Sequence, residues 1–233
     1  MTYTDFHMHV LPGIDDGSPD VETSLAMLEA SAAQRIGTVV ASSHFYASEN
    51  SPTRFLKKRE AAWQTLREAM AGRRNLPRVL LGAEVYFFNG IGTTTDLEAL
   101  CVQGTDLLLL EMPCSAWNGR MLDEVARIVA RGIVPVCAHI DRYIPLQSKG
   151  MLREFYSTGI RLQANADFFL SRSPRKAFRM LKDGEISYLG SDAHNTGSRA
   201  PNLGPALELI RKKTGRPAPA LLRGGGVIEE DEW

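Results

Sequence analysis

The chain has 233 residues, of which 44% are hydrophobic and 23% charged, as is usual for a globular protein with a sizeable core. Its 27 lysines and arginines balance its 27 aspartates and glutamates, which argues against a general attraction to nucleic acid or an anionic membrane. The three cysteines form no Cys-x-x-Cys pair and favour a reducing compartment over a disulfide framework. The N-terminus carries no signal-like segment, and no apolar run approaches the roughly 18 residues that span a bilayer. We therefore expect a cytoplasmic protein without membrane insertion.

Segments typical of strands alternate with segments typical of helices along the whole chain. Short apolar, β-branched runs predict strands over residues 2–8, 36–42, 78–83, 106–110, 133–138, 160–162 and 186–189. Helical spacing and N-terminal capping residues predict helices over residues 21–28, 54–70, 96–100, 121–130, 152–156, 174–181 and 205–213. This alternation implies a parallel sheet with right-handed crossovers. We expect one domain over residues 1–233, with a loosely ordered tail from about residue 215.

Polar side chains follow each of the seven predicted strands. His7 and His9 end the first strand and point to the same side, because side chains alternate along a strand. The chain has only five histidines, and the other three also stand beside predicted strand ends. In parallel α/β folds, ligands bind beyond the carboxyl ends of the strands. An open sheet would spread these residues along a line, so we predict a (β/α)7-type barrel that gathers them on one rim.

This pattern predicts a metal centre. The candidate ligands are His7, His9, Asp16, His44, Glu84, Glu111, His139, Asp192 and His194. They exceed what one ion takes, and mixed imidazole and carboxylate ligation suits Mn²⁺, Fe²⁺ or Zn²⁺. Glu84 and Glu111 end apolar strands, where a carboxylate is costly unless it is paired or bound. Asp15, Asp16 and Asp192 stand in turn-rich sequence, where Asp also serves as a turn former or cap.

Several divalent ions on a barrel rim indicate hydrolysis, because bound ions activate water and stabilise the oxygens of a phosphoryl group. Such a substrate is anionic and calls for arginine, whose guanidinium binds phosphate through two parallel hydrogen bonds. Arg142 follows His139, and Arg199 follows His194 after a short loop. We predict these two arginines as the phosphate-binding residues.

The motifs resemble the polymerase-and-histidinol-phosphatase (PHP) superfamily. Within it, they resemble the bacterial manganese-dependent protein-tyrosine phosphatases of capsule and exopolysaccharide clusters. The matching motifs run in family order from residue 5 to about residue 202. They are Asp5-Phe6-His7-Met8-His9 with Leu11-Pro12-Gly13-Ile14-Asp15-Asp16-Gly17, Ser43-His44-Phe45, Gly82-Ala83-Glu84-Val85, Glu111-Met112-Pro113, Ala138-His139-Ile140-Asp141-Arg142 and Ser191-Asp192-Ala193-His194-Asn195.

The resemblance implies a distorted (β/α)7 TIM-like barrel with two or three divalent ions, Mn²⁺ first and Fe²⁺ or Zn²⁺ as alternatives. It implies three ligand groups, namely His7, His9, Glu84 and Asp192; Glu84, Glu111 and His139; and Asp16, His44 and His194. Where the family usually has Thr-Pro-His and Pro-Glu-Arg, this chain has Ser42-Ser43-His44 and Ile140-Asp141-Arg142. Neither change removes a ligand.

The expected reaction is attack of a metal-bridging hydroxide on phosphorus, with Arg142 and Arg199 stabilising the developing charge. A phenolate leaving group, with a pKa of about 10, needs little proton help. Either Asp141 or a metal-bound water would supply that proton. The expected substrate is a phosphotyrosine-bearing protein, with a bacterial tyrosine autokinase as one candidate.

Three alternatives remain open. The first keeps the metals and takes histidinol phosphate or another small phosphomonoester as substrate. The second is a thiol phosphatase, since Cys114 and Arg120 have the Cys-x5-Arg spacing of such enzymes, although this leaves all five histidines unexplained. The third is a metal-dependent binding module without catalytic activity.

Overall fold

The computed structural model describes residues 3–218, whose strands are all parallel and lie in two sheets. One sheet has the order β1-β2-β4 and the other the order β3-β5-β6-β7-β8-β9. The strands are β1 (Tyr3–Met8), β2 (Ile36–Ala41), β3 (His44–Phe45), β4 (Arg78–Leu81), β5 (Glu84–Tyr86), β6 (Leu107–Glu111), β7 (Val134–Cys137), β8 (Arg161–Asn165) and β9 (Tyr188–Gly190). The helices are α1 (Val21–Ala33), α2 (Pro52–Met70), η1 (Ile91–Thr93), η2 (Leu97–Leu100), α3 (Gly119–Ala130), α4 (Ile140–Tyr143), α5 (Lys149–Ser157), α6 (Ala166–Leu170), α7 (Arg175–Lys182) and α8 (Leu203–Thr214).

Two short strands beyond the predicted ranges, β3 and β5, bring the seven expected strands to nine. The strand predicted to run to residue 83 ends at Leu81, and Glu84 begins the separate strand β5. Beside this break, in the neighbouring strand, Ser42 and Ser43 separate β2 from β3. Backbone hydrogen bonds continue across the gap, from Gly82 N to Ala41 O at 2.9 Å and from Glu84 N to Ser43 O at 3.0 Å. The two sheets therefore form one curved surface with a step.

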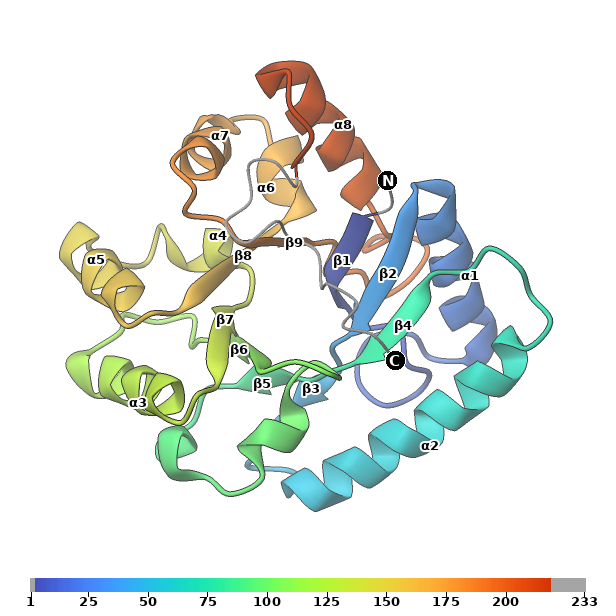
Figure 1. Ribbon diagram of the computed structural model, residues 1–233, viewed down its shortest axis with the longest axis horizontal. Coiled ribbons are helices and arrows are strands. Elements are labelled where there is room, and N and C mark those ends of the chain that lie inside the picture. The colour runs from blue at the N-terminus through green and yellow to red at the C-terminus, as the bar shows by residue number, and fades with distance from the viewer. Residues whose placement is uncertain (1–2, 219–233) are drawn as a thin grey trace.

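The curved surface returns on itself between β9 and β1. Asp192 N donates to His7 O at 2.8 Å, and His9 N donates to Ala193 O at 2.9 Å. Viewed along the short axis, the longer helices surround the strands on the outside (Figure 1). This arrangement confirms the predicted distorted α/β barrel, and the two interruptions are its distortion. No helix within residues 3–218 has the length and apolar character needed to cross a membrane.

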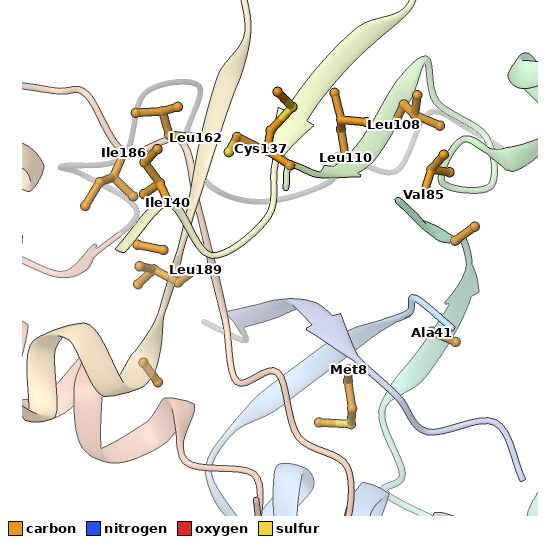
Figure 2. Close-up of a cluster of buried hydrophobic side chains, with 14 of the residues drawn as sticks. Met8, Ala41, Val85, Leu108, Leu110, Cys137, Ile140, Leu162, Ile186 and Leu189 are labelled. Carbon is orange, nitrogen blue, oxygen red and sulfur yellow. The ribbon is translucent and has the colours of Figure 1, made fainter. Parts of the chain in front are cut away.

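The hydrophobic core lies on both surfaces of the barrel. A smaller cluster consists almost entirely of strand residues, among them Phe6 and Tyr188, whose rings stack with centroids 4.1 Å apart. A larger cluster lies between the strands and the helices, and Figure 2 shows part of it, including Leu108, Leu110 and Leu162. Burial on both surfaces explains why strands such as β6 are continuous apolar runs rather than alternating ones.

All seven predicted helices are present with shifted ends, the one over residues 96–100 as the short 3-10 helix η2. Asp20, Ser51, Asn118 and Ser148 cap α1, α2, α3 and α5, each accepting a hydrogen bond from a backbone N–H of the first turn. Helix α5 begins at Lys149, three residues before its predicted start, because Ser148 provides this cap. The short helices α4 and α6 were not predicted. The part of the expected C-terminal tail from residue 219 onward lies outside the described residues.

Candidate metal and phosphate site

All nine candidate ligands lie together at the carboxyl ends of the strands. His7 lies in β1 and Glu111 ends β6, while His44 and Glu84 begin β3 and β5 just beyond the step. The other five follow strands in loops or turns, namely His9, Asp16, His139, Asp192 and His194. Most of the nine are buried, whereas His44 is half-buried and Asp16 is 64% exposed. The predicted convergence of these residues is therefore observed in the structure.

Glu84 is the centre of the cluster. Its Oε2 lies 3.1 Å from His7 Nε2, 3.2 Å from His9 Nε2 and 3.2 Å from His44 Nδ1. Its Oε1 lies 2.9 Å from His139 Nε2. Burial alone would raise the pKa of Glu84, but the charge of His7 and the hydrogen bonds from the histidines hold it well below its usual value. Glu84 is therefore a buried carboxylate that stays ionised.

His7 and His9 face each other across the site, with their Nε2 atoms 3.1 Å apart. The outer nitrogen of His9, Nδ1, lies 2.8 Å from Asp15 Oδ2, which fixes the orientation of the ring. Burial lowers the pKa of His9, yet the hydrogen bonds to Asp15 and Glu84 outweigh it and raise the pKa to about 10. Both inner nitrogens are thus directed at one point with carboxylates beside them.

A second group lies toward the solvent. Asp16 Oδ1 is 3.5 Å from His44 Nε2 and 3.4 Å from His194 Nε2. Three sets of ligand atoms lie within 4.8 Å of one another, namely His9, Asp16, His44 and His194; His7, His9 and Glu84; and His44, Glu84 and Glu111. These sets overlap the three expected groups without matching them, since Asp192 belongs to none of the sets and His9 joins Asp16, His44 and His194. His44 rather than His139 completes the set with Glu111, although His139 Nε2 is only 3.6 Å from Glu111 Oε1.

Several polar atoms of the cluster lack the partners that burial normally requires. Glu111 Oε2, His44 Nδ1 and His194 Nε2 are buried and have no hydrogen-bond partner among residues 3–218. Burial, followed by the charge of Glu84, raises the pKa of Glu111 to about 7. Divalent cations would satisfy these atoms and neutralise the adjacent carboxylates. The donor set therefore fits the two or three divalent ions that the sequence predicts.

Backbone strain and close packing hold the ligands in place. His139 and Asp192 have φ angles of 30° and 54°, in the left-handed region that residues other than glycine seldom adopt. Gly17 and Gly190 allow the chain to approach His9 and His7, since a Cβ there would lie 2.4 Å from His9 Cβ or 2.6 Å from His7 Cβ. Any side chain at Gly17 or Gly190 would displace a histidine.

The two predicted phosphate-binding arginines both contact Asp192. Arg142 forms an ion pair with its Oδ2, and Arg199 Nη2 lies 2.9 Å from its Oδ1. Both guanidinium groups are about 40% exposed, so they border the cluster on its open side. Asp141 lies deeper, and its Oδ1 accepts a hydrogen bond from Asn165 N at 3.0 Å. Its assignment as a proton donor stays a prediction.

The sequence did not reveal that three residues position the ligands, although one of them, Gln163, is a polar residue that follows a predicted strand. Asp15, considered only as a turn former, binds His9 and also accepts a hydrogen bond from His44 N at 2.9 Å. Gln163 Oε1 accepts a hydrogen bond from His139 N at 2.6 Å and lies 3.3 Å from His7 Nδ1. Asp5 Oδ1 accepts hydrogen bonds from the backbone N–H groups of His7 and Ser191. A polar residue inside an apolar strand, as at Asp5 and Gln163, was the available signal.

The loop of the thiol-phosphatase alternative has other hydrogen-bond partners. Asn118 caps α3 with its own side chain, so the backbone N–H of Met121 in the first turn already has a partner. Gln147 Oε1 accepts the hydrogen bond of Trp117 N at 2.9 Å. Cys114 is a free, exposed thiol. The geometry therefore favours the histidine and carboxylate cluster over Cys114 as the reactive centre.

Comparisons with known proteins agree with the motif resemblance. The tyrosine-protein phosphatase CpsB of Streptococcus pneumoniae is 27% identical over 228 residues, covering 91% of this chain and 90% of that protein. The tyrosine-protein phosphatase YwqE of Bacillus subtilis is 27% identical over 237 residues, covering 94% and 87%. A crystal structure from work on these two proteins, described as unique metal-dependent tyrosine phosphatases, superposes with a TM-score of 0.79. It is 24% identical, covers 97% of this chain and 96% of that one, and confirms the fold.

A family model provides the assignment. The model of capsular polysaccharide synthesis proteins of the CpsB/CapC type matches residues 3–222, which is nearly the whole chain and includes every candidate ligand. The resemblance predicted from the motifs is thereby confirmed at the level of the family. The chain belongs to the CpsB/CapC family of capsular polysaccharide synthesis proteins.

Proposed function

We propose that the protein is a metal-dependent phosphatase that hydrolyses phosphotyrosine in proteins. The observation that carries this proposal is the cluster around Glu84, where nine candidate metal ligands lie beside two arginines suited to phosphate. The similar proteins from S. pneumoniae and B. subtilis bear the name tyrosine-protein phosphatase and match over nine-tenths of this chain. Family membership and site chemistry thus support the same activity.

The proposed roles follow from the contacts of each residue. Divalent ions, with Mn²⁺ proposed as the native metal, would lower the pKa of a bound water and offset charge on the phosphoryl oxygens. The nine cluster residues are the proposed ligands. Arg142 and Arg199 would turn from Asp192 toward the phosphoryl oxygens and stabilise their charge as the ester bond breaks. Burial raises the pKa of Asp141, which favours its protonated form and supports it as the donor to the leaving oxygen.

We further propose the setting in which the enzyme works. Cys101, Cys114 and Cys137 are all free thiols, which supports the reducing environment of the cytoplasm. The proposed partner is a phosphotyrosine-bearing protein, with a tyrosine autokinase as the first candidate. The neutral charge balance supports a substrate other than nucleic acid.

The decisive experiment combines metal analysis with a substrate panel. We expect the purified protein to contain two or three divalent ions per chain, to lose activity with a chelator and to regain it with Mn²⁺. A phosphotyrosine peptide should have a higher kcat/KM than histidinol phosphate. The reverse preference would assign the protein to small phosphomonoesters. Bound metal without turnover of p-nitrophenyl phosphate would instead make it a binding module.

A further inference from the structure

Two tyrosines follow two of the candidate ligands at the same spacing. Tyr46 comes two residues after His44, and Tyr86 comes two residues after Glu84. Strands β3 and β5 pair in parallel with His44 opposite Glu84 and Phe45 opposite Val85. Because side chains alternate along a strand, each tyrosine continues on the side of the ligand that precedes it. The register then brings Tyr46 beside Tyr86, one step farther from the barrel.

Ring geometry supports this placement. The rings of His44 and Tyr46 are stacked, with centroids 5.2 Å apart and an angle of 28° between their planes. The rings of Tyr46 and Tyr86 are 5.6 Å apart. On its other side, Tyr86 is paired in register with Glu111, so the aromatic pair adjoins the set of His44, Glu84 and Glu111. Three rings therefore run in series from the cluster outward.

Both tyrosines retain exposed surface. Each is half-buried, in contrast to the buried Phe45 and Val85 that precede them in the two strands. A partly exposed aromatic surface beside a phosphate-binding site suits an aromatic ring attached to that phosphate.

We propose that Tyr46 and Tyr86 form an aromatic wall that contacts the phenyl ring of the substrate while its phosphoryl group occupies the cluster. The wall rests on the proposed phosphatase function and adds a determinant of its specificity. It favours aryl over alkyl phosphomonoesters, because paired aromatic rings attract each other beyond the effect of the area they bury. An alkyl ester such as phosphoserine offers no ring to this surface.

The test uses two inhibitors that cannot be hydrolysed, phenylphosphonate and methylphosphonate. Their inhibition constants are measured against a phosphotyrosine peptide for the Mn²⁺-loaded wild type, Tyr46→Leu, Tyr86→Leu and the control Tyr46→Phe. We expect each leucine variant to raise the constant for phenylphosphonate by about 2- to 12-fold and the KM of the peptide similarly. The constant for methylphosphonate should stay unchanged, and Tyr46→Phe should behave as the wild type.

Other outcomes separate this role from its alternatives. Equal weakening of both inhibitors together with lost Mn²⁺ would mean that Tyr46 only supports His44, and would overturn the wall. Unchanged constants in both leucine variants would also overturn it, while the proposed function would stand on the activity of the wild type. A wild type inactive on the phosphotyrosine peptide would overturn the proposed function and the wall together.

Discussion

Replacing Glu84 with glutamine tests the centre of the site. The change preserves the shape of the side chain and removes its charge. Of the three sets of ligand atoms, two contain Glu84, and one, comprising His9, Asp16, His44 and His194, does not. We therefore expect Glu84→Gln to retain at most one ion, held by this outer set, and to lose phosphatase activity.

The expected loss of folding stability has two parts, one from the ions that no longer bind and one from the lost contacts of Glu84. An ion at 100 times its dissociation constant stabilises the fold by about 2.7 kcal/mol, so three ions would add about 8 kcal/mol and a single ion about a third of that. Without metal, the free energy of unfolding of Glu84→Gln should also be about 3–5 kcal/mol lower than that of the wild type. The reason is that four imidazoles within 3.2 Å lose the buried carboxylate they surround.

Three measurements check this prediction. Metal content gives the number of ions, urea unfolding with and without Mn²⁺ gives the stabilisation, and phosphotyrosine hydrolysis gives the activity. Glu98→Gln is the matched control, since Glu98 is 57% exposed and its carboxylate pairs with Arg131 rather than with a histidine of the cluster. Three ions of undiminished affinity in Glu84→Gln would refute the central place of Glu84.

Three further predictions concern residues beside the cluster. Arg199→Lys should lower kcat/KM for a phosphotyrosine peptide about 10-fold with unchanged metal content, because one ammonium replaces a two-pronged contact; an unaltered kcat/KM would exclude Arg199 from phosphate binding. Burial raises the pKa of Asp5 to about 6 despite its hydrogen bonds to Ser191, so the ionised form destabilises the metal-free fold as pH rises from about 4 through 6. Relative to wild type, Asp5→Asn should gain about 2 kcal/mol in free energy of unfolding between about pH 4.5 and pH 7.5, and a constant difference would contradict this. Cys114→Ser should keep full activity and chelator sensitivity; lost activity would revive the thiol mechanism.

The site was predictable from the sequence where one local rule decided the outcome. His7 and His9 lie on one side of a strand because of alternation, and Glu84 and Glu111 follow apolar runs that only strands explain. Barrel closure then followed from the need to bring these strand ends together. Each step used residue type and spacing alone, which is why all nine candidate ligands lie in the cluster.

Features that depend on contacts between distant segments were not predictable in the same way. Residues 78–86 look like one continuous strand in the sequence. The break between Leu81 and Glu84 is visible only in the structure, where Glu84 N donates to Ser43 O across the gap between the two sheets. Asp15 stands in a turn-rich loop, where an aspartate is equally typical of a helix cap, so residue type alone does not predict its hydrogen bond to His9. Helix α4 begins directly after the left-handed turn at His139, a conformation that residue type does not indicate for a histidine.

The features that make the site fit cations also oppose folding without them. His7 and His9 place ring nitrogens 3.1 Å apart, His139 and Asp192 adopt strained φ angles, and Glu111 has a buried oxygen without a partner within the described chain. Each costs free energy in the metal-free protein, and cations between these groups would offset the first and the last. Because each strained residue lies two positions beyond the end of β7 or β9, the carboxyl ends of these strands should be the least stable part of the barrel without metal. Amide hydrogen exchange there should slow on adding Mn²⁺ far more than in the amino-terminal halves of the same strands.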